Sequence, residues 1–280
     1  MEARKIERIV RPESVLEGAG VRLRRSIATR SLDHVDPFLL LDHFDSMDPE
    51  DYIAGFPMHP HRGIETVTYM LSGEIHHRDS LGNEGSIHNG DLQWMTSGSG
   101  ILHEEMPDGG SGRMAGFQLW VNLPAKLKMT KPRYQDIRAS RIPEVRRDDG
   151  AVLRVVAGTV ENVVGPVTDI AADPTYLDIA LPPNTSSSFP VPRGHTAFSY
   201  VFEGQGDFNG SSTAAPSLIV WGDGDFIQAK ASKAGVRFLL VSAKPLHEPV
   251  ARYGPFVMNT KEEIEEALRD LRRGTFVKEN

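Results

Sequence analysis

The sequence predicts an all-β protein made of two barrels of short antiparallel strands and one short helix near its end. Three observations lead to this prediction. Residues 52–123 alternate strand-like apolar runs with turns that contain glycine, a pattern typical of antiparallel barrels and sandwiches. Similar sequence recurs after a shift of 131 residues. Helical periodicity stands out only over residues 261–273.

In the first half, apolar or alternating runs predict the strands. The runs cover residues 4–11, 21–27, 37–41, 66–71, 74–80, 92–95 and 114–123. We interpret residues 42–46 as a turn. Their Ser, His and Asp do not predict a catalytic triad, because neighbours on an extended chain point apart.

Residues 124–150 carry eight lysines and arginines together with three prolines. We interpret this stretch as a solvated connector. The predicted domains are therefore an N-terminal barrel over residues 1–135 and a C-terminal barrel with the final helix over residues 136–280.

The internal repeat predicts a duplicated β domain. The shift lays the Arg-Gly pair at 62–63 on a second Arg-Gly pair at 193–194, but it lays His59 and His61 on prolines. The strand expected at 236–241 contains neither histidine nor glutamate. The second half therefore keeps the strand pattern and lacks the candidate ligands described below.

The predicted helix has recognisable ends. Thr260 and Glu263 form a capping box, Ile264, Leu268 and Leu271 lie four and three residues apart, and Gly274 follows as a stop. These features predict a helix that packs through one face.

Composition excludes several kinds of protein. The 280 residues carry a formal charge of −7, with 39% hydrophobic and 25% charged residues, which is typical of a globular protein with no nucleic-acid or membrane partner. The absence of cysteine excludes disulfides, thiol nucleophiles and iron–sulfur clusters. With a charged N-terminus and no membrane-length apolar run, we expect a cytoplasmic protein.

Two short patterns predict a metal site. Side chains two residues apart on a strand share a face, so His59 and His61 point together, as do His103 and Glu105. Two such pairs can converge on one ion at about 2.1 Å per bond. A lone pair of either kind is commonly a solvated strand or a charged turn, but six of the ten histidines lie between residues 59 and 103.

Longer blocks of sequence resemble the pirin family of the cupin superfamily. They are HPHRGIETVTYMLSGEIHHRDSLGN, GDLQWMTSGSGILHEEMP, GFQLWVNLP and HEPVARYGPFVMNT. The resemblance implies a bicupin with two face-to-face jelly-roll barrels and the metal in the N-terminal one. It also implies the ligands His59, His61, His103 and Glu105. General cupins take their carboxylate from the first motif, so Glu65 is a competitor unless Gly63 breaks the strand.

Three imidazoles and a carboxylate suit several transition metals. The resemblance points to iron, divalent or trivalent, with manganese, cobalt, nickel, copper and zinc as alternatives. Four protein ligands leave open positions on an ion that prefers six, which favours substrate or dioxygen chemistry over a structural role.

The resemblance implies quercetin 2,3-dioxygenase activity, in which dioxygen cleaves a flavonol with release of carbon monoxide. Glu105 would be both ligand and general base. Candidates for the pocket wall are Phe56, Arg62, Trp94 and Gln118, together with Met58, Met95, Phe117 and Trp120.

The alternative is a non-catalytic iron-binding regulator, because members of this family are also described as binding a transcription factor or a metabolic enzyme. A structural salt bridge is an equal interpretation of Arg62.

Overall fold

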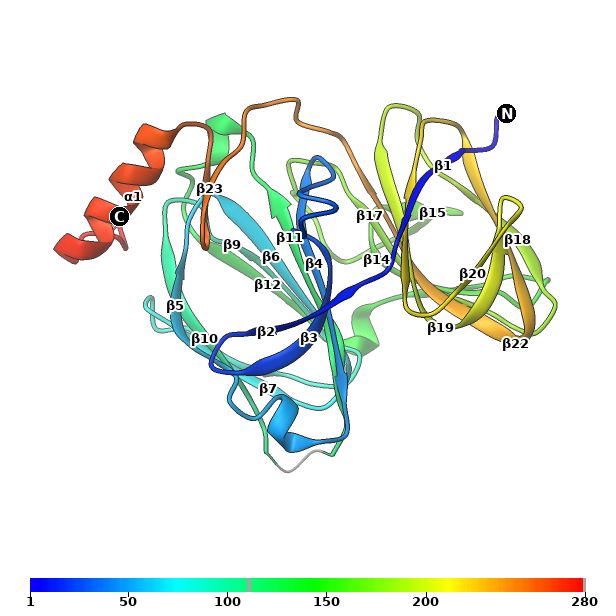
Figure 1. Ribbon diagram of the computed structural model, residues 1–280, viewed down its shortest axis with the longest axis horizontal. Coiled ribbons are helices and arrows are strands. Elements are labelled where there is room, and N and C mark those ends of the chain that lie inside the picture. The colour runs from blue at the N-terminus through cyan, green and yellow to red at the C-terminus, as the bar shows by residue number, and fades with distance from the viewer. Residues whose placement is uncertain (110–111, 279–280) are drawn as a thin grey trace. The chain divides into compact units, whose positions relative to one another are not determined.

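The computed structural model describes residues 1–109 and 112–278, which form two compact units (Figure 1). The first unit consists of Glu13–Ala139 together with Leu246–Asn280. The second unit consists of Met1–Pro12 together with Ser140–Pro245. Each unit thus combines segments that lie far apart in the sequence.

The first unit contains two antiparallel sheets. A four-stranded sheet has the order β5-β10-β7-β8, and a seven-stranded sheet has the order β12-β9-β6-β11-β4-β3-β2. The strands are β2 Glu13–Glu17, β3 Val21–Ile27, β4 Phe38–Ser46, β5 Phe56–His61, β6 Ile64–Ser72, β7 Ile75–Asp79, β8 Glu84–Ile87, β9 Leu92–Thr96, β10 Ile101–Pro107, β11 Met114–Asn122 and β12 Arg133–Ile137. Short 3₁₀ turns occur at Pro49–Asp51, Ala125–Leu127 and, where the units meet in sequence, Ala139–Arg141.

The second unit is built on one nine-stranded antiparallel sheet. Its order is β1-β21-β19-β22-β17-β14-β13, with β18 paired to β22 and β20 to β19. The strands are β1 Ile6–Val10, β13 Glu144–Arg146, β14 Val152–Ala157, β17 Thr175–Leu181, β18 Ser186–Pro190, β19 Thr196–Phe208, β20 Ser211–Ala214, β21 Ser217–Trp221 and β22 Phe226–Ala243, and β15 Thr159–Val160 pairs with β16 Val163–Val164. The long strands enclose an apolar core that includes Leu153, Ile179, Phe208 and Phe238.

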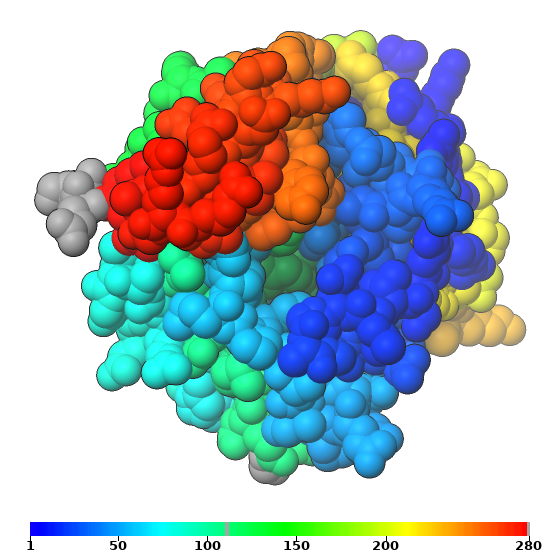
Figure 2. Space-filling model, turned by 60° about the vertical axis from the view of Figure 1, so that its left-hand side comes forward, coloured from blue at the N-terminus to red at the C-terminus, as the bar shows by residue number. Residues whose placement is uncertain are grey.

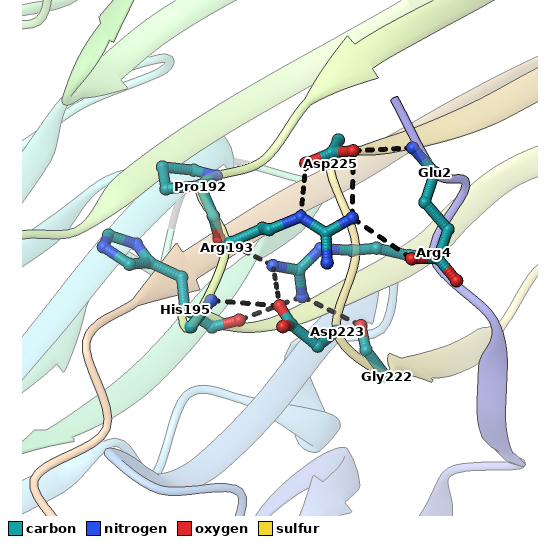
Figure 3. A network of polar contacts seen from close by, with 9 residues as sticks. Glu2, Arg4, Pro192, Arg193, His195, Gly222, Asp223 and Asp225 are labelled. Carbon is teal, nitrogen blue, oxygen red and sulfur yellow. Dashed lines mark hydrogen bonds and ion pairs between the residues drawn. The ribbon is translucent and has the colours of Figure 1, made fainter.

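Arg4 explains why the N-terminal segment belongs to the second unit. Its buried guanidinium donates hydrogen bonds to the backbone carbonyls of Pro192, His195 and Gly222 at 2.7 to 3.0 Å (Figure 3). The Glu2 amide donates to Asp225, which also accepts from Arg193 (Figure 3). Removing the Arg4 side chain would leave the carbonyls of Pro192, His195 and Gly222 without these hydrogen bonds.

The C-terminal segment packs on the first unit. It forms the hairpin of β23 Ala251–Tyr253 and β24 Phe256–Met258, and then the helix α1 Lys261–Arg273. A small core of Phe256, Met258, Ile264, Ala267 and Phe276 joins the hairpin to the helix. The predicted helix is confirmed with its capping box, and Gly274 ends it in the left-handed conformation at φ 71°.

The structure differs from three expectations about the chain. The two domains are not contiguous, because residues 1–12 belong to the second unit and α1 to the first. Residues 42–46 are not a turn but the end of β4, which is paired on both sides by β3 and β11. The basic connector contains β12, and Lys128 within it is buried and donates to three oxygens, those of Gly63, Asn122 and Val257.

Among residues 1–109 and 112–278, no helix has both the length and the apolar character needed to cross a membrane.

Candidate metal centre

Three histidines converge on the inner side of the four-stranded sheet. His59 lies directly opposite His103 in the antiparallel pairing of β5 with β10, and His61 lies two residues further along β5. Alternation therefore places all three side chains on one face, as the sequence predicted. One ring nitrogen from each lies within 4.8 Å of the other two, and the ring centroids are 4.5 to 5.1 Å apart.

The hydrogen bonds of His59 fit a metal ligand. Its Nδ1 lies 2.9 Å from the carbonyl oxygen of Pro57, which can only accept, so Nδ1 carries the proton. The lone pair is then on Nε2, which lies 3.1 Å from Nε2 of His61. A backbone carbonyl that fixes the tautomer in this way is the usual partner of a metal-bound histidine.

Burial keeps the other two imidazoles neutral. Loss of hydration, followed by the neighbouring His59 ring, holds the pKa of His61 well below its usual value. Burial and the rings of His61, His59 and His77 do the same for the pKa of His103. Neutral imidazole is the form that binds a metal.

His103 gives a direct test of fit. Both of its ring nitrogens are buried, and neither has a hydrogen-bond partner among the residues that the structure describes. A buried polar group without a partner costs about 1–3 kcal/mol. A metal ion bound to one nitrogen would relieve part of this cost, so the residues present fit such an ion.

Glu105 lies near the histidines but not within the close group of three. It follows His103 by two residues on β10, and the pairing with β5 shifts between them. The Thr68 hydroxyl of β6 can donate its proton to Glu105 Oε1 or to Gln118 Oε1, each 2.8 Å away. Glu105 is therefore held by a side chain of the facing sheet, and its role as fourth ligand remains a prediction.

Glu65 occupies a different place. Gly63, with φ 80°, separates β5 from β6, and the two strands belong to different sheets, so alternation does not continue from His61 to Glu65. Thr68 faces the histidines, and Glu65 lies on the opposite face of β6 because the two are three residues apart. Its carboxylate accepts from Thr96 at 2.9 Å, and burial raises its pKa to about 7.

The histidines open into a cavity of about 820 Å³ within the first unit. Figure 2 shows its mouth as a recess bordered by the C-terminal hairpin in orange, residues 17–19 in blue and β5 in lighter blue. His59, His61 and Glu105 line it together with apolar side chains, among them Leu23, Leu40, Phe44, Ile75 and Trp120. The volume lies within the range of sites for drug-sized ligands.

The structure places the predicted pocket residues differently. Phe56 and Gln118 line the cavity, as does Trp120, whereas Arg62 and Trp94 are buried away from it. The Arg62 guanidinium donates to Asp270 at 2.8 Å and to the Phe276 carbonyl at 3.0 Å, and it lies over the Phe276 ring. Arg62 thus fastens the C-terminal segment to the turn after β5.

Sequence reasoning missed most of the cavity residues, among them Thr68 and Arg252. Thr68 is one of several alternating residues of β6, and nothing in its local sequence marks it. The structure places it opposite Gln118 and within hydrogen-bonding distance of Glu105. Arg252 comes from the C-terminal hairpin, about 150 residues beyond the metal strands. No local pattern indicates that this hairpin returns to the first unit.

An antiparallel β unit with a group of three histidines beside its cavity, combined with a second β unit without such a group in the described residues, defines a two-domain cupin fold with a candidate metal centre. Comparison with known proteins gives the family. The Pirin profile matches residues 20–121, and the profile of the Pirin C-terminal cupin domain matches residues 176–277. The chain belongs to the pirin family.

Relatives cover the chain almost completely. A pirin-like protein of Caulobacter vibrioides is 44% identical over 99% of this chain and 100% of its own length. A Pseudomonas aeruginosa protein named "Putative quercetin 2,3-dioxygenase" is 46% identical over 92% of this chain and 93% of its own. The crystal structure of a quercetin 2,3-dioxygenase from Acinetobacter baumannii is similar with a TM-score of 0.91, at 36% identity and 98% coverage of both chains.

Proposed function

We propose that this protein is a metal-dependent dioxygenase that cleaves flavonols such as quercetin, with loss of carbon monoxide. The observation that carries the proposal is the convergence of His59, His61 and His103 beside a large, mainly apolar cavity that His59, His61 and the Glu105 carboxylate line. The names of the relatives support the same reaction.

The proposed ligands are the three histidines and Glu105, and iron is the metal that we expect. When bound, such an ion would supply a Lewis acid for the flavonol 3-hydroxyl and a template for dioxygen. The three neutral imidazoles leave the ion's positive charge largely uncompensated. Because only one ligand is a carboxylate, the site keeps a net positive charge, and this charge favours the binding of an anionic oxygen.

Glu105 is the proposed base. Thr68 can donate to Oε1, and Oε2 has no hydrogen bond to the described residues, so it is free to accept the proton of a flavonol hydroxyl. Because the cavity walls are largely apolar side chains, a bound flavonol would displace water from around this carboxylate. Thr68 keeps the oxygens oriented while the proton moves.

The test combines metal analysis with turnover. Purified protein of known metal content is mixed with quercetin in air, and the loss of flavonol absorbance and the release of carbon monoxide are followed. We expect the wild-type protein to release carbon monoxide in proportion to the quercetin that it consumes. His61→Ala should neither consume quercetin nor release carbon monoxide.

Thr96→Ser is a matched control, because Thr96 is buried in the same unit but lies on β9 away from the cavity. Fully metallated protein that consumes no flavonol would contradict the proposal. The non-catalytic regulator predicted as the alternative would then account better for the bound metal, and a search for a protein partner would follow.

A further inference from the structure

The cavity extends from the metal centre towards a group of charged side chains. One row of the seven-stranded sheet runs from Thr68 through Gln118 and Asp42 to Arg25, which are successive cross-strand neighbours on β6, β11, β4 and β3. Adjacent strands are about 4.8 Å apart, so Asp42 and Arg25 lie about 10 and 14 Å from Thr68. The cavity therefore has charged side chains that could bind part of a substrate well away from the proposed reacting atoms.

The carboxylates of this charged wall already have partners. Asp42 accepts two hydrogen bonds from Arg25, at 2.7 and 2.8 Å, and Glu17 accepts a third at 2.5 Å. Asp33 is paired with His34 at 2.7 Å. The charges of these carboxylates and their partners largely neutralise one another, so a charged ligand would gain little by binding to them.

Arg252 differs from them. Its guanidinium donates one hydrogen bond, to the Leu39 carbonyl at 3.1 Å, and no carboxylate of the described residues lies within 4.0 Å. It lies 5.1 Å from the centre of the Trp120 ring, which in turn contacts the ring of His61 at 5.1 Å. Most of its N–H donors therefore remain available beside the cavity, two ring contacts from the metal centre.

The hairpin that carries Arg252 is firmly anchored. The amide of Val257 donates to the Arg62 carbonyl at 3.1 Å, and Lys128 Nζ donates to the Val257 carbonyl at 2.8 Å. The apolar cluster around Phe256 and Phe276 fixes its other side. The Arg252 side chain on this hairpin is itself held by the Leu39 carbonyl and the Trp120 ring, so it has less conformational entropy to lose on binding a ligand than a side chain without such contacts.

We propose that Arg252 determines substrate specificity by binding an anionic oxygen, a carboxylate or a phenolate, on the part of a planar aromatic substrate that lies away from the metal centre. The planar guanidinium donates in parallel to such oxygens, and its stacking on Trp120 orients it. Burial and the neighbouring Arg25 lower the pKa of Arg252, which an incoming anion would counteract. The inference rests on the proposed function, because it takes the metal centre as the site of the other end of the substrate.

Binding measured without oxygen tests the inference separately from catalysis. The metal-loaded protein is titrated anaerobically with 3-hydroxyflavone, which has no remote acidic group, and with its 4′-carboxylate and 7-carboxylate. We expect at least one carboxylate to bind about 10- to 100-fold more tightly than the parent, the usual range for a hydrogen bond to a charged group. Arg252→Gln should remove this preference and leave binding of the parent within about twofold.

Two further variants separate recognition from structure. Arg252→Lys, which keeps the charge but not the parallel donors, should restore part of the preference. Tyr253→Ser on the same hairpin, whose side chain is 61% exposed and does not line the cavity, should keep all of it. The inference would be overturned if the wild-type protein showed no preference for either carboxylate. It would also be overturned if Arg252→Gln bound all three ligands, the parent included, equally and more weakly than the wild type binds the parent.

The outcomes also distinguish the two proposals. Tight, Arg252-dependent binding of a carboxylate without cleavage in air would refute the dioxygenase and retain the role of Arg252. Cleavage of 3-hydroxyflavone without any Arg252-dependent preference would refute the role of Arg252 and retain the dioxygenase. Failure to bind any of the three flavonols would refute both.

Discussion

Replacing Glu65 by glutamine tests the choice between the two candidate carboxylates. Glu65 lies on the face of β6 opposite Thr68, is buried, and has a pKa raised to about 7 by loss of hydration. Glutamine has the same shape and can still accept the hydrogen bond from Thr96 that Glu65 accepts at 2.9 Å. The substitution therefore removes a buried charge at alkaline pH and little else.

The magnitude follows from linkage between protonation and folding. A carboxyl whose pKa rises from 4.5 in the unfolded chain to about 7 in the folded protein stabilises the fold below pH 4.5 and loses that contribution as the pH rises through 7. The neutral glutamine does not titrate. Relative to the wild type, Glu65→Gln should gain about 2.5 kcal/mol in free energy of unfolding between pH 5 and pH 8.

The assay is urea unfolding of both proteins at pH 5 and pH 8, with the metal content of each sample determined beforehand. We expect unchanged metal content and a gain in stability that appears mainly at pH 8. Loss of metal from Glu65→Gln, or a variant less stable than the wild type at pH 8, would show that Glu65 is ionised and bound to a cation. The assignment of the carboxylate to Glu105 would then be wrong.

Three further substitutions test the site and its support. His103→Ala should lower metal affinity at least 10-fold without unfolding the protein, as measured by equilibrium dialysis, and unchanged affinity would remove His103 from the ligand set. Gly63→Ala should destabilise the first unit by about 2–4 kcal/mol in urea unfolding, because φ is 80° and a Cβ would lie 2.0 Å from the Val257 carbonyl oxygen. A neutral result would mean that the turn can shift. Arg62→Ala should cost about 1–3 kcal/mol, because the Phe276 carbonyl loses its buried donor and Asp270 keeps only Lys278 as a partner. Hydrogen exchange should show α1 opening first, and unchanged protection would refute this role.

Local patterns were sufficient for most strands and for the helix. The run Val21–Ile27 and the helix Lys261–Arg273 have the predicted bounds, because alternation and capping residues act over a few neighbours. The convergence of His59, His61 and His103 was also predictable. It depends on the two-residue period of strands and on a cross-strand pairing that hairpins commonly form.

Where the pattern was interpreted wrongly, a distant partner decides the conformation. Residues 42–46 contain polar side chains typical of a turn, yet they continue β4, because Asp42 is paired with Arg25 on the next strand and the backbone is hydrogen-bonded on both sides. Lys128 lies in a basic stretch that predicts exposure, but three oxygen acceptors allow its burial.

The sequence by itself determined the β class, the duplication, the helix and the histidines that could hold a metal, since each depends on residue type and short spacing. Only the tertiary structure decided that the last 35 residues return to the first unit, that Arg62 holds them there, and that Arg252 lines the cavity. It also placed Glu105, and not Glu65, on the cavity wall. These outcomes depend on which distant segments bury each other's apolar and charged groups, and no local period in the chain records that choice.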